Sequence, residues 1–250
     1  MLKVWTDVEA FHKRPLEDKY IYLFLDGVHL GIKGAVKRKK RPVLLAYGIT
    51  EDGQRELVGF RVARSESEAQ WVAFLNDLYK RGLEGERLKL IVIDGGKGLI
   101  AALDVVYPYT KRGRCWAHKL RNVAIKLERV HLKPCMAEAK DIFNAPSRRE
   151  AIKRFKTWKE RWHVEEERAV RCMEKDLYHC LHYYSFPREL WKRIRTTNLL
   201  ERAFREVRRR TRPMGFFPTD DSAQRIFYGV TNGIHQNGHH PLPIQSQQKS

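Results

Sequence analysis

Two apolar runs, each closed by an Asp-Gly pair, constrain the fold of this 250-residue chain more than any other feature. They are YIYLFLDG (20–27) and LKLIVIDGG (88–96), and both have the length and composition of buried strands. Between them, RPVLLAYGITEDG (41–53) and RELVGFRVARS (55–65) meet at another Asp-Gly pair, which predicts an antiparallel hairpin. We therefore expect a sheet whose first and fourth strands each end in an aspartate.

Helical spacing of apolar residues dominates the rest of the chain. Segment 65–82 opens with a capping signal and predicts a helix that buries Trp71, Phe74, Leu75 and Leu78. A short helix is expected at about residues 99–106, followed by a strand leading to Cys115. Beyond His118, two helical faces are formed by Ala151, Phe155, Trp158 and Trp162, and by Val170, Met173, Leu177, Leu181 and Tyr184. The arginine-rich block TTNLLERAFREVRRRTR (196–212) precedes a last helix at about 219–233.

This order of elements predicts an α/β fold with a ribonuclease H-like core, a mixed five-stranded sheet flanked by helices and interrupted by an all-α insertion. The expected parts are a linker from a missing N-terminal region (1–19), the first part of the core (20–118), the helical insertion (119–192), the C-terminal core helices (193–233) and a polar, disordered tail (234–250).

The charge of the chain is concentrated in one region. The net charge is +19, with 18 basic and 15 acidic side chains in residues 1–110 but 29 and 13 in residues 111–212. Such an excess indicates a polyanionic partner, and we expect DNA, although any single lysine or arginine can be a solvated helix residue. The sequence lacks an 18-residue apolar run and a signal core, so we expect no membrane association and a cytoplasmic, nucleoid-associated protein.

Three carboxylates are candidates for metal chemistry. Asp26 and Asp94 follow the two apolar runs, and neighbouring strands would bring both to one sheet edge, where oxygen ligands suit Mg²⁺. Each aspartate can instead be an ordinary Asp-Gly turn residue. Glu201 fits a capping box with Asn198 and an ion pair with Arg205, so its pattern alone leaves capping, ion pairing and metal binding open.

Four motifs together resemble the mutator-type transposases of bacterial insertion sequences, a family with an Asp-Asp-Glu catalytic core. They are YLFLDGVHL, LIVIDGGKGL, RCWAHKLRN and TTNLLERAFREVRRRT, and the resemblance runs from about residue 14 to about residue 228. It implies that Asp26, Asp94 and Glu201 are catalytic and bind two Mg²⁺ or Mn²⁺ ions. It also implies DNA strand cleavage and strand transfer, with water and then a 3′-hydroxyl as nucleophiles, by a homo-oligomer, expected to be a dimer, on DNA.

Cys115-x-x-His118 also matches an element of this family. A zinc site would need further ligands from Cys172, His179, Cys180 or His182, and their spacing is not typical of one. The preferred interpretation is that Cys115 packs while His118 contacts a DNA phosphate or a carboxylate. The expected DNA-contacting residues are Lys39, Lys40, His118, Lys119, Arg121, Asn198, Arg205, Arg208, Arg209 and Arg210.

Two other positions have open alternatives. Trp158 and Trp162 can stack on a displaced base, but their place on an apolar helix face favours core packing. The basic run Lys37–Arg41 is either a phosphate-contacting loop or a solvated hairpin tip.

The first functional hypothesis is an N-terminally truncated transposase catalytic core. The alternative is a non-catalytic DNA-binding remnant that competes or co-assembles with a full-length enzyme. A host nuclease of the same fold is a weaker third hypothesis.

Overall fold

The computed structural model describes residues 2–33, 38–211 and 217–237, which form two compact units. The first unit contains the described residues up to Ile91, residues 95–110 and those from Leu199 onward. The second unit contains Val92–Asp94 and Lys111–Asn198. None of the described helices is long and apolar enough to cross a membrane.

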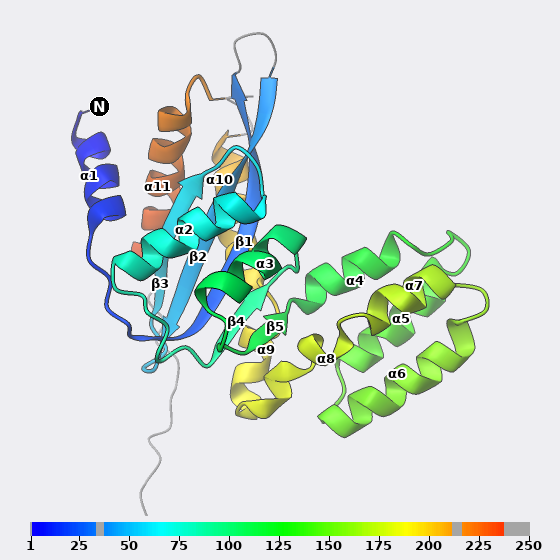
Figure 1. The fold of residues 1–250 in the computed structure, drawn as a ribbon. Helices are drawn as coiled ribbons and strands as arrows, with labels where there is room; N and C mark the ends of the chain where they lie inside the picture. The colour runs from blue at the N-terminus through cyan, green and yellow to red at the C-terminus, as the bar shows by residue number, and fades with distance from the viewer. Residues whose placement is uncertain (1, 34–37, 212–216, 238–250) are drawn as a thin grey trace, which may run out of the picture. The chain divides into compact units, whose positions relative to one another are not determined.

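Five strands form one sheet in the order β3-β2-β1-β4-β5 (Figure 1). They are β1 (Tyr20–Lys33), β2 (Arg38–Thr50), β3 (Arg55–Val62), β4 (Leu90–Ile93) and β5 (Arg112–Arg114). The β1–β2 and β2–β3 pairs are antiparallel. The predicted hairpin between β2 and β3 is confirmed: Gly53 has φ 82° and its N–H donates to the Thr50 carbonyl at 3.0 Å. The fold is therefore α/β with a mixed five-stranded sheet flanked by helices.

The first strand is longer than its apolar run. Asp26 was predicted to end this strand, and an ordinary Asp-Gly turn was the alternative interpretation, but β1 continues to Lys33, and Gly27 pairs with Leu44 of β2. The turn interpretation of Asp26 is therefore wrong. The strand continues because β2 is long enough to supply a partner for every residue from Tyr22 to Lys33.

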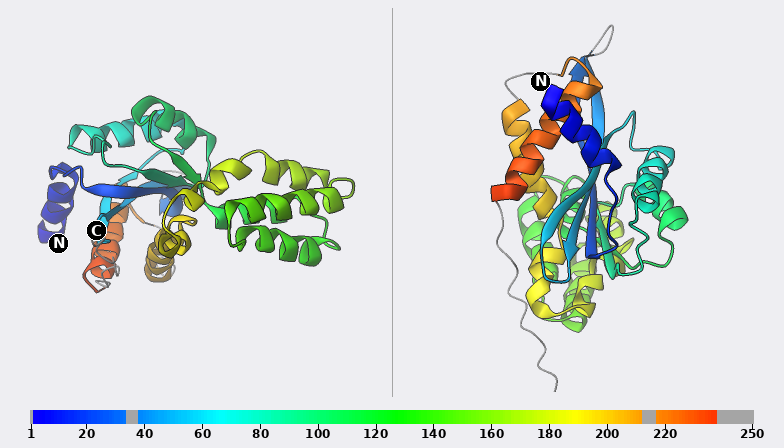
Figure 2. Two further views of the ribbon diagram at one scale, coloured as in Figure 1. Left: turned by 90° about the horizontal axis from the view of Figure 1, so that it is seen from below. Right: turned by 90° about the vertical axis from the view of Figure 1, so that its left-hand side faces the viewer.

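In the first unit, helices cover both faces of the sheet. Its helices are α1 (Leu2–Lys13), α2 (Glu68–Lys80), α3 (Lys97–Val106), α10 (Asn198–Thr211) and α11 (Asp220–Asn237). α2 and α3 lie together on one face, whereas α10 and α11 lie on the other (Figure 2). The four predicted core residues of α2 are all buried, as their helical spacing required.

The chain ends differ from the predictions. Residues 1–19 were expected to be a linker, but Leu2–Lys13 form α1, because Val8 is buried and Phe11 stacks on Phe60 with ring centroids 5.7 Å apart. At the other end, the last helix was expected to stop at about residue 233, but α11 continues to Asn237. The rest of the predicted tail lies outside the described residues.

The described residues of the second unit are almost entirely helical after β5. Its elements are α4 (Trp116–Ala124), α5 (Leu132–Phe143), α6 (Arg148–Trp162), α7 (Glu167–Glu174), α8 (Leu177–Cys180), two short 3₁₀ turns (His182–Ser185 and Arg188–Leu190) and α9 (Trp191–Ile194). Trp158 and Trp162 pack in its core, with exposures of 2% and 4%. The Trp158 indole N–H donates to the Cys135 carbonyl at 3.1 Å, so the core interpretation of both tryptophans is confirmed.

A polar cluster joins the chain after α1 to β3. Arg14 donates to the carbonyl of Leu57 at 2.9 Å and to Glu56 Oε1 at 3.0 Å. The other oxygen of Glu56 accepts from the Tyr20 hydroxyl at 2.8 Å and lies 3.2 Å from Lys19 Nζ. Burial alone would raise the pKa of Glu56, but its hydrogen bonds with Tyr20 and Arg14 and the charge of Lys19 hold that pKa below its ordinary value.

We expect Glu56→Gln to lower the free energy of unfolding at pH 7 by about 1–2 kcal/mol, because a partly buried charge-assisted cluster is lost. Since the pKa of Glu56 is lower in the folded state, this stabilisation is present above the unfolded carboxyl pKa of about 4.3 and is lost as the pH falls through the folded value. Urea denaturation at pH 7 and at lower pH measures the difference. An equal deficit throughout the acidic range would contradict the assignment.

Glu17→Gln is the matched control. Its carboxylate is mostly exposed and lies 3.7 Å from Lys19 Nζ, so the change should cost less than about 0.5 kcal/mol.

Candidate functional site

Asp26 is a buried carboxylate inside β1. Its exposure is 4%, it lies opposite Leu45 in the ladder, and its Oδ1 accepts the Gly27 N–H at 2.8 Å. The preceding residues Leu23 to Leu25 are completely buried. A carboxylate in such a setting is costly for a structural role alone, which makes Asp26 a functional candidate.

Asp94 directly follows β4. The Cys115 N–H donates to the carbonyl of Ile93 at 2.8 Å, so Asp94 comes immediately after a backbone-paired residue. Gly95 then has φ 88°, a conformation that favours glycine, and the chain turns into α3. The sequence prediction that Asp94 ends its strand is confirmed, and its side chain is half-buried.

Glu201 lies in the first turn of α10 and is half-buried. Three residues of the predicted apolar face, Leu200, Phe204 and Val207, are buried. The fourth, Ala203, has a side chain outside the described residues. Glu201 is thus held on a helix whose orientation is fixed by an adjacent apolar stripe.

Arg209 and Arg210 of α10 are exposed, and both lie close to Glu206. Arg209 Nη2 donates to Glu206 Oε2 at 2.9 Å, and Arg210 Nε lies 3.9 Å from the same oxygen. The hydrogen bond from Arg209 holds the pKa of Glu206 below its ordinary value. Glu206 was not predicted from the sequence, although its i,i+3 and i,i+4 spacing from the two arginines is the pattern of helix ion pairs. Arg205 and Arg208 are also exposed, as is Asn198 at the start of the helix.

Cys115, Thr197 and His118 form a hydrogen-bonded group in the second unit. The Cys115 sulfur accepts from the Thr197 N–H at 3.2 Å and from the Thr197 hydroxyl at 3.3 Å. The same hydroxyl lies 3.3 Å from His118 Nδ1. Cys115 and Thr197 are completely buried, whereas His118 is half-buried. Thr197 therefore links the Cys-x-x-His element to the residues that precede α10, a role that the sequence analysis did not identify.

The zinc interpretation of this element is not supported. Burial raises the pKa of the Cys115 and Cys180 thiols, which disfavours the thiolate that zinc binds. His182 Nδ1 is engaged with the Arg112 carbonyl. Within the described ranges, no group of three or more His, Cys, Asp or Glu side chains is arranged to hold a metal ion.

Lys119 was predicted to contact DNA, but its side chain is buried and engaged within the protein. Its exposure is 2%, its Nζ forms an ion pair with Asp176 Oδ1, and it donates to the Cys172 carbonyl at 2.6 Å. Arg114 Nε lies 2.9 Å from the other oxygen of Asp176. Lys119 points inward because it shares the buried face of α4 with Trp116 and Val123, a spacing visible in the sequence.

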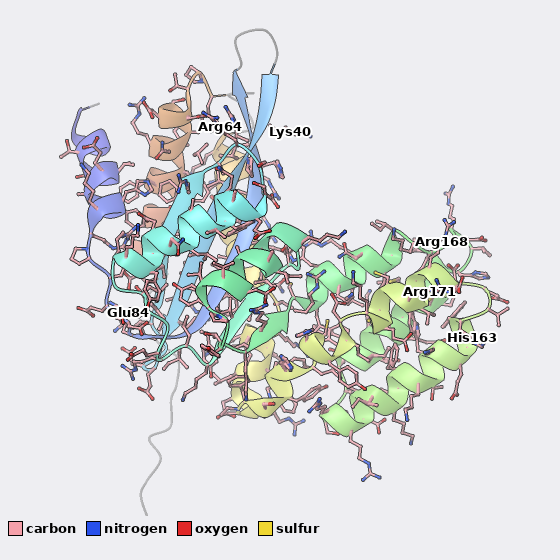
Figure 3. The ribbon with its side chains drawn as sticks, in the orientation of Figure 1. Lys40, Arg64, Glu84, His163, Arg168 and Arg171 are labelled. Atoms are coloured by element: carbon pink, nitrogen blue, oxygen red, sulfur yellow. The ribbon has the colours of Figure 1, made fainter. Side chains whose placement is uncertain are left out.

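The remaining predicted DNA-contacting residues lie on α4 and β2. Arg121 is exposed on α4. Lys40 is exposed on β2 (Figure 3). The basic run Lys37–Arg41 was expected to be either a phosphate-contacting loop or a solvated hairpin tip, but Arg38–Arg41 belong to β2 and pair with Leu30–Lys33. The side chain of Lys39 and the whole of Lys37 lie outside the described residues.

Comparison with known proteins places the chain among transposases of one family. A family model described as "Transposase, Mutator family" matches residues 2–240. The transposase for insertion sequence element ISRM5 of Rhizobium meliloti is 33% identical over 92% of this chain and 57% of the relative. The transposase for IS406 of Burkholderia multivorans is 37% identical over 90% and 57%, and that for IS905 of Lactococcus lactis is 32% identical over 88% and 55%. The chain thus spans less than two thirds of the length of these relatives.

For Lys119→Met we expect the free energy of unfolding to fall by about 3 kcal/mol, because Asp176 loses one partner of a buried ion pair. The folded variant should bind duplex DNA with an unchanged salt dependence. Arg121→Ala should behave in the opposite way. It should have little effect on stability, and the slope of log binding constant against log salt concentration should fall in magnitude by about one. Chemical denaturation and DNA binding at several salt concentrations measure both. A reduced slope in Lys119→Met would restore its role as a DNA contact.

Thr197→Val should break the Cys115–Thr197–His118 group at a cost of about 1 kcal/mol. We expect the ring-nitrogen NMR shifts of His118 to change, because its Nδ1 loses the hydroxyl partner. Thr197→Ser keeps the hydroxyl and should preserve those shifts. If the valine and serine variants gave the same His118 spectrum, the hydroxyl would have no influence on the ring.

Proposed function

Because the chain belongs to the Mutator family of transposases, we propose that it contains the catalytic core of an insertion-sequence transposase, which cleaves DNA strands and transfers them. The observation that carries the proposal is the buried carboxylate of Asp26 in a strand that neighbours β4, after which Asp94 follows. Glu201 is the third proposed catalytic carboxylate.

Asp26, Asp94 and Glu201 are proposed to hold two Mg²⁺ or Mn²⁺ ions. Their oxygen donors are of the kind that hard divalent cations prefer, so the donor chemistry fits, although no group of three such side chains in the described residues is already arranged to hold an ion. When bound, such a pair activates a water or a 3′-hydroxyl and stabilises the leaving oxygen in a phosphoryl displacement. The contribution of the chain is to position its carboxylates: Asp26 through the strand ladder, Asp94 through the turn at Gly95, and Glu201 through the buried stripe of α10.

The fold proposed for this core is ribonuclease H-like, with residues 119–192 as an all-α insertion. Two observations support it. In the strand order β3-β2-β1-β4-β5, β1 carries Asp26, pairs with β2 on one side and has on its other side β4, the strand that Asp94 follows. Every element described between residues 116 and 194 is helical.

DNA is the proposed substrate, held by the positive charge of the chain. The proposed contacts are the exposed or half-buried members of the predicted set: Lys40, His118, Arg121, Asn198, Arg205, Arg208, Arg209 and Arg210. When DNA binds, Arg209 and Arg210 would release Glu206 and pair with phosphate groups instead. We also propose that the chain acts as a homodimer on DNA.

We expect Asp94→Ala to reduce Mn²⁺-dependent nicking of transposon-end DNA by more than about 100-fold, because one carboxylate of the proposed metal site is lost. Asp26→Asn and Glu201→Gln should have a similar effect, with salt-dependent DNA binding retained. Asp141→Ala, on the exposed side of α5, is the matched control and should nick normally. The measurement is a nicking assay on labelled DNA carrying the ends of the element.

Normal nicking by Asp94→Ala would refute the proposed catalytic role of this residue. Salt-sensitive DNA binding without nicking by the unaltered chain would instead favour the alternative, a non-catalytic remnant that competes or co-assembles with a full-length enzyme.

A further inference from the structure

The first unit has an acidic, tyrosine-lined groove away from the three proposed catalytic carboxylates. Its volume is about 660 Å³, and it lies between the C-terminal ends of α2 and α3 and the loop before β4. Tyr79 and Val105 contribute exposed apolar surface, and Tyr109 is 99% exposed. Glu84 and Glu86 supply two carboxylates, and Glu84 is labelled on this loop in Figure 3.

Hydrogen bonds hold the acidic loop in place. The Asp18 carboxylate accepts the N–H of Gly85 at 3.1 Å and the N–H of Glu86 at 2.8 Å. Gly85 has φ 87°, and a Cβ at this position would lie 2.9 Å from the ring of Tyr107. The Tyr107 hydroxyl donates to the Leu83 carbonyl at 2.7 Å. The groove is therefore preformed rather than a product of a flexible loop.

The two glutamates of the groove have no cationic partner within the described part of the chain. The neighbouring arginines are engaged elsewhere: Arg81 with Asp77 at 3.2 Å, and Arg87 with Glu51 at 2.5 Å. Unpaired carboxylates repel phosphate, so the groove does not suit DNA. Carboxylates beside exposed tyrosine rings instead suit a lysine or arginine side chain, through ion pairing and cation–π contact.

A complementary set of cations lies on α6 in the second unit. Arg149, Lys153 and Lys156 are exposed and are spaced four and three residues apart, so they form one stripe along the helix. None of the three forms an ion pair with any described residue. Three other cations of α6 are paired, Arg154 with Glu150, Lys159 with Glu174 and Arg161 with Glu138, whereas Arg148 at the start of the helix is exposed and forms no ion pair with a described residue.

We propose that the groove of one copy of this chain binds the Arg149–Lys153–Lys156 stripe of a second copy. The basis of this assignment is that the carboxylates of the groove and the cations of the stripe carry opposite charge, and that neither set has an ion-pair partner among the described residues. A two-fold arrangement would form the contact twice, groove to stripe and stripe to groove. The inference deepens the homodimer part of the proposed function and does not depend on the cleavage chemistry.

The test is sedimentation equilibrium of the whole chain without DNA, at about 0.15 M salt so that long-range repulsion between the basic chains is screened. We expect reversible dimerisation. Glu84→Arg with Glu86→Arg should weaken it about tenfold or more, and so should Lys153→Glu with Lys156→Glu. An equimolar mixture of the two variants should restore association, because both groove–stripe contacts of the mixed dimer then join opposite charges.

Glu9→Arg with Glu68→Arg is the control for the groove variant. Both glutamates are exposed outside the groove, and the change in net charge is the same as for Glu84→Arg with Glu86→Arg. This variant should dimerise like the unaltered chain. Circular dichroism establishes that each variant is folded before it is compared.

A monomer at every concentration, or no restoration in the mixed sample, would overturn the proposal. Binding of a lysine-rich peptide to the groove without self-association would also overturn it and identify a different basic protein as the partner. Because DNA is absent throughout, failure here leaves the proposed nicking activity to be judged by its own assay.

Discussion

The antiparallel pairing of β1 with β2 determines where Asp26 lies. Twelve consecutive residues of β1, from Tyr22 to Lys33, are paired in one register with β2, and Asp26 is opposite Leu45 within this ladder. Successive side chains of a strand alternate between faces, so a shift of one residue would move Asp26 to the other face of the sheet. The surrounding leucines are buried on both strands, which makes such a shift costly. The carboxylate is therefore positioned by backbone pairing and core packing together.

In the second unit, the candidate residue His118 is held by side-chain contacts rather than by strand pairing. On one side of α4, Lys119 is joined to Asp176, which also pairs with Arg114 of β5. At the start of α4, Cys115 accepts two hydrogen bonds from Thr197, whose hydroxyl also contacts His118. The helix is thus anchored to two separate parts of the unit. These contacts fix the position of His118, although its own side chain is not buried.

Periodic features were predictable from the sequence, whereas features that depend on distant partners were not. The buried faces of α2 and α6 follow 3.6-residue spacing, and the β2–β3 hairpin follows its Asp-Gly turn. The extension of β1 past Asp26 depends on β2 as a partner, and α1 is held by contacts such as that of Phe11 with Phe60. In the candidate site, the end of β4 at Asp94 was predictable. The burial of Lys119 could have been inferred from its spacing, but Asp176 as its partner could not.

The environment of the cysteines has a consequence for their reactivity. Cys115, Cys135 and Cys180 are buried, and burial raises the pKa of each thiol, to about 11 for Cys135. The thiolate is the form that reacts with oxidants and alkylating reagents, so at neutral pH these three thiols react slowly while the chain is folded. Their rates of alkylation therefore report opening of the structure. Cys135 and Cys180 report on the helices of the second unit, and Cys115 reports on the junction between β5 and α4.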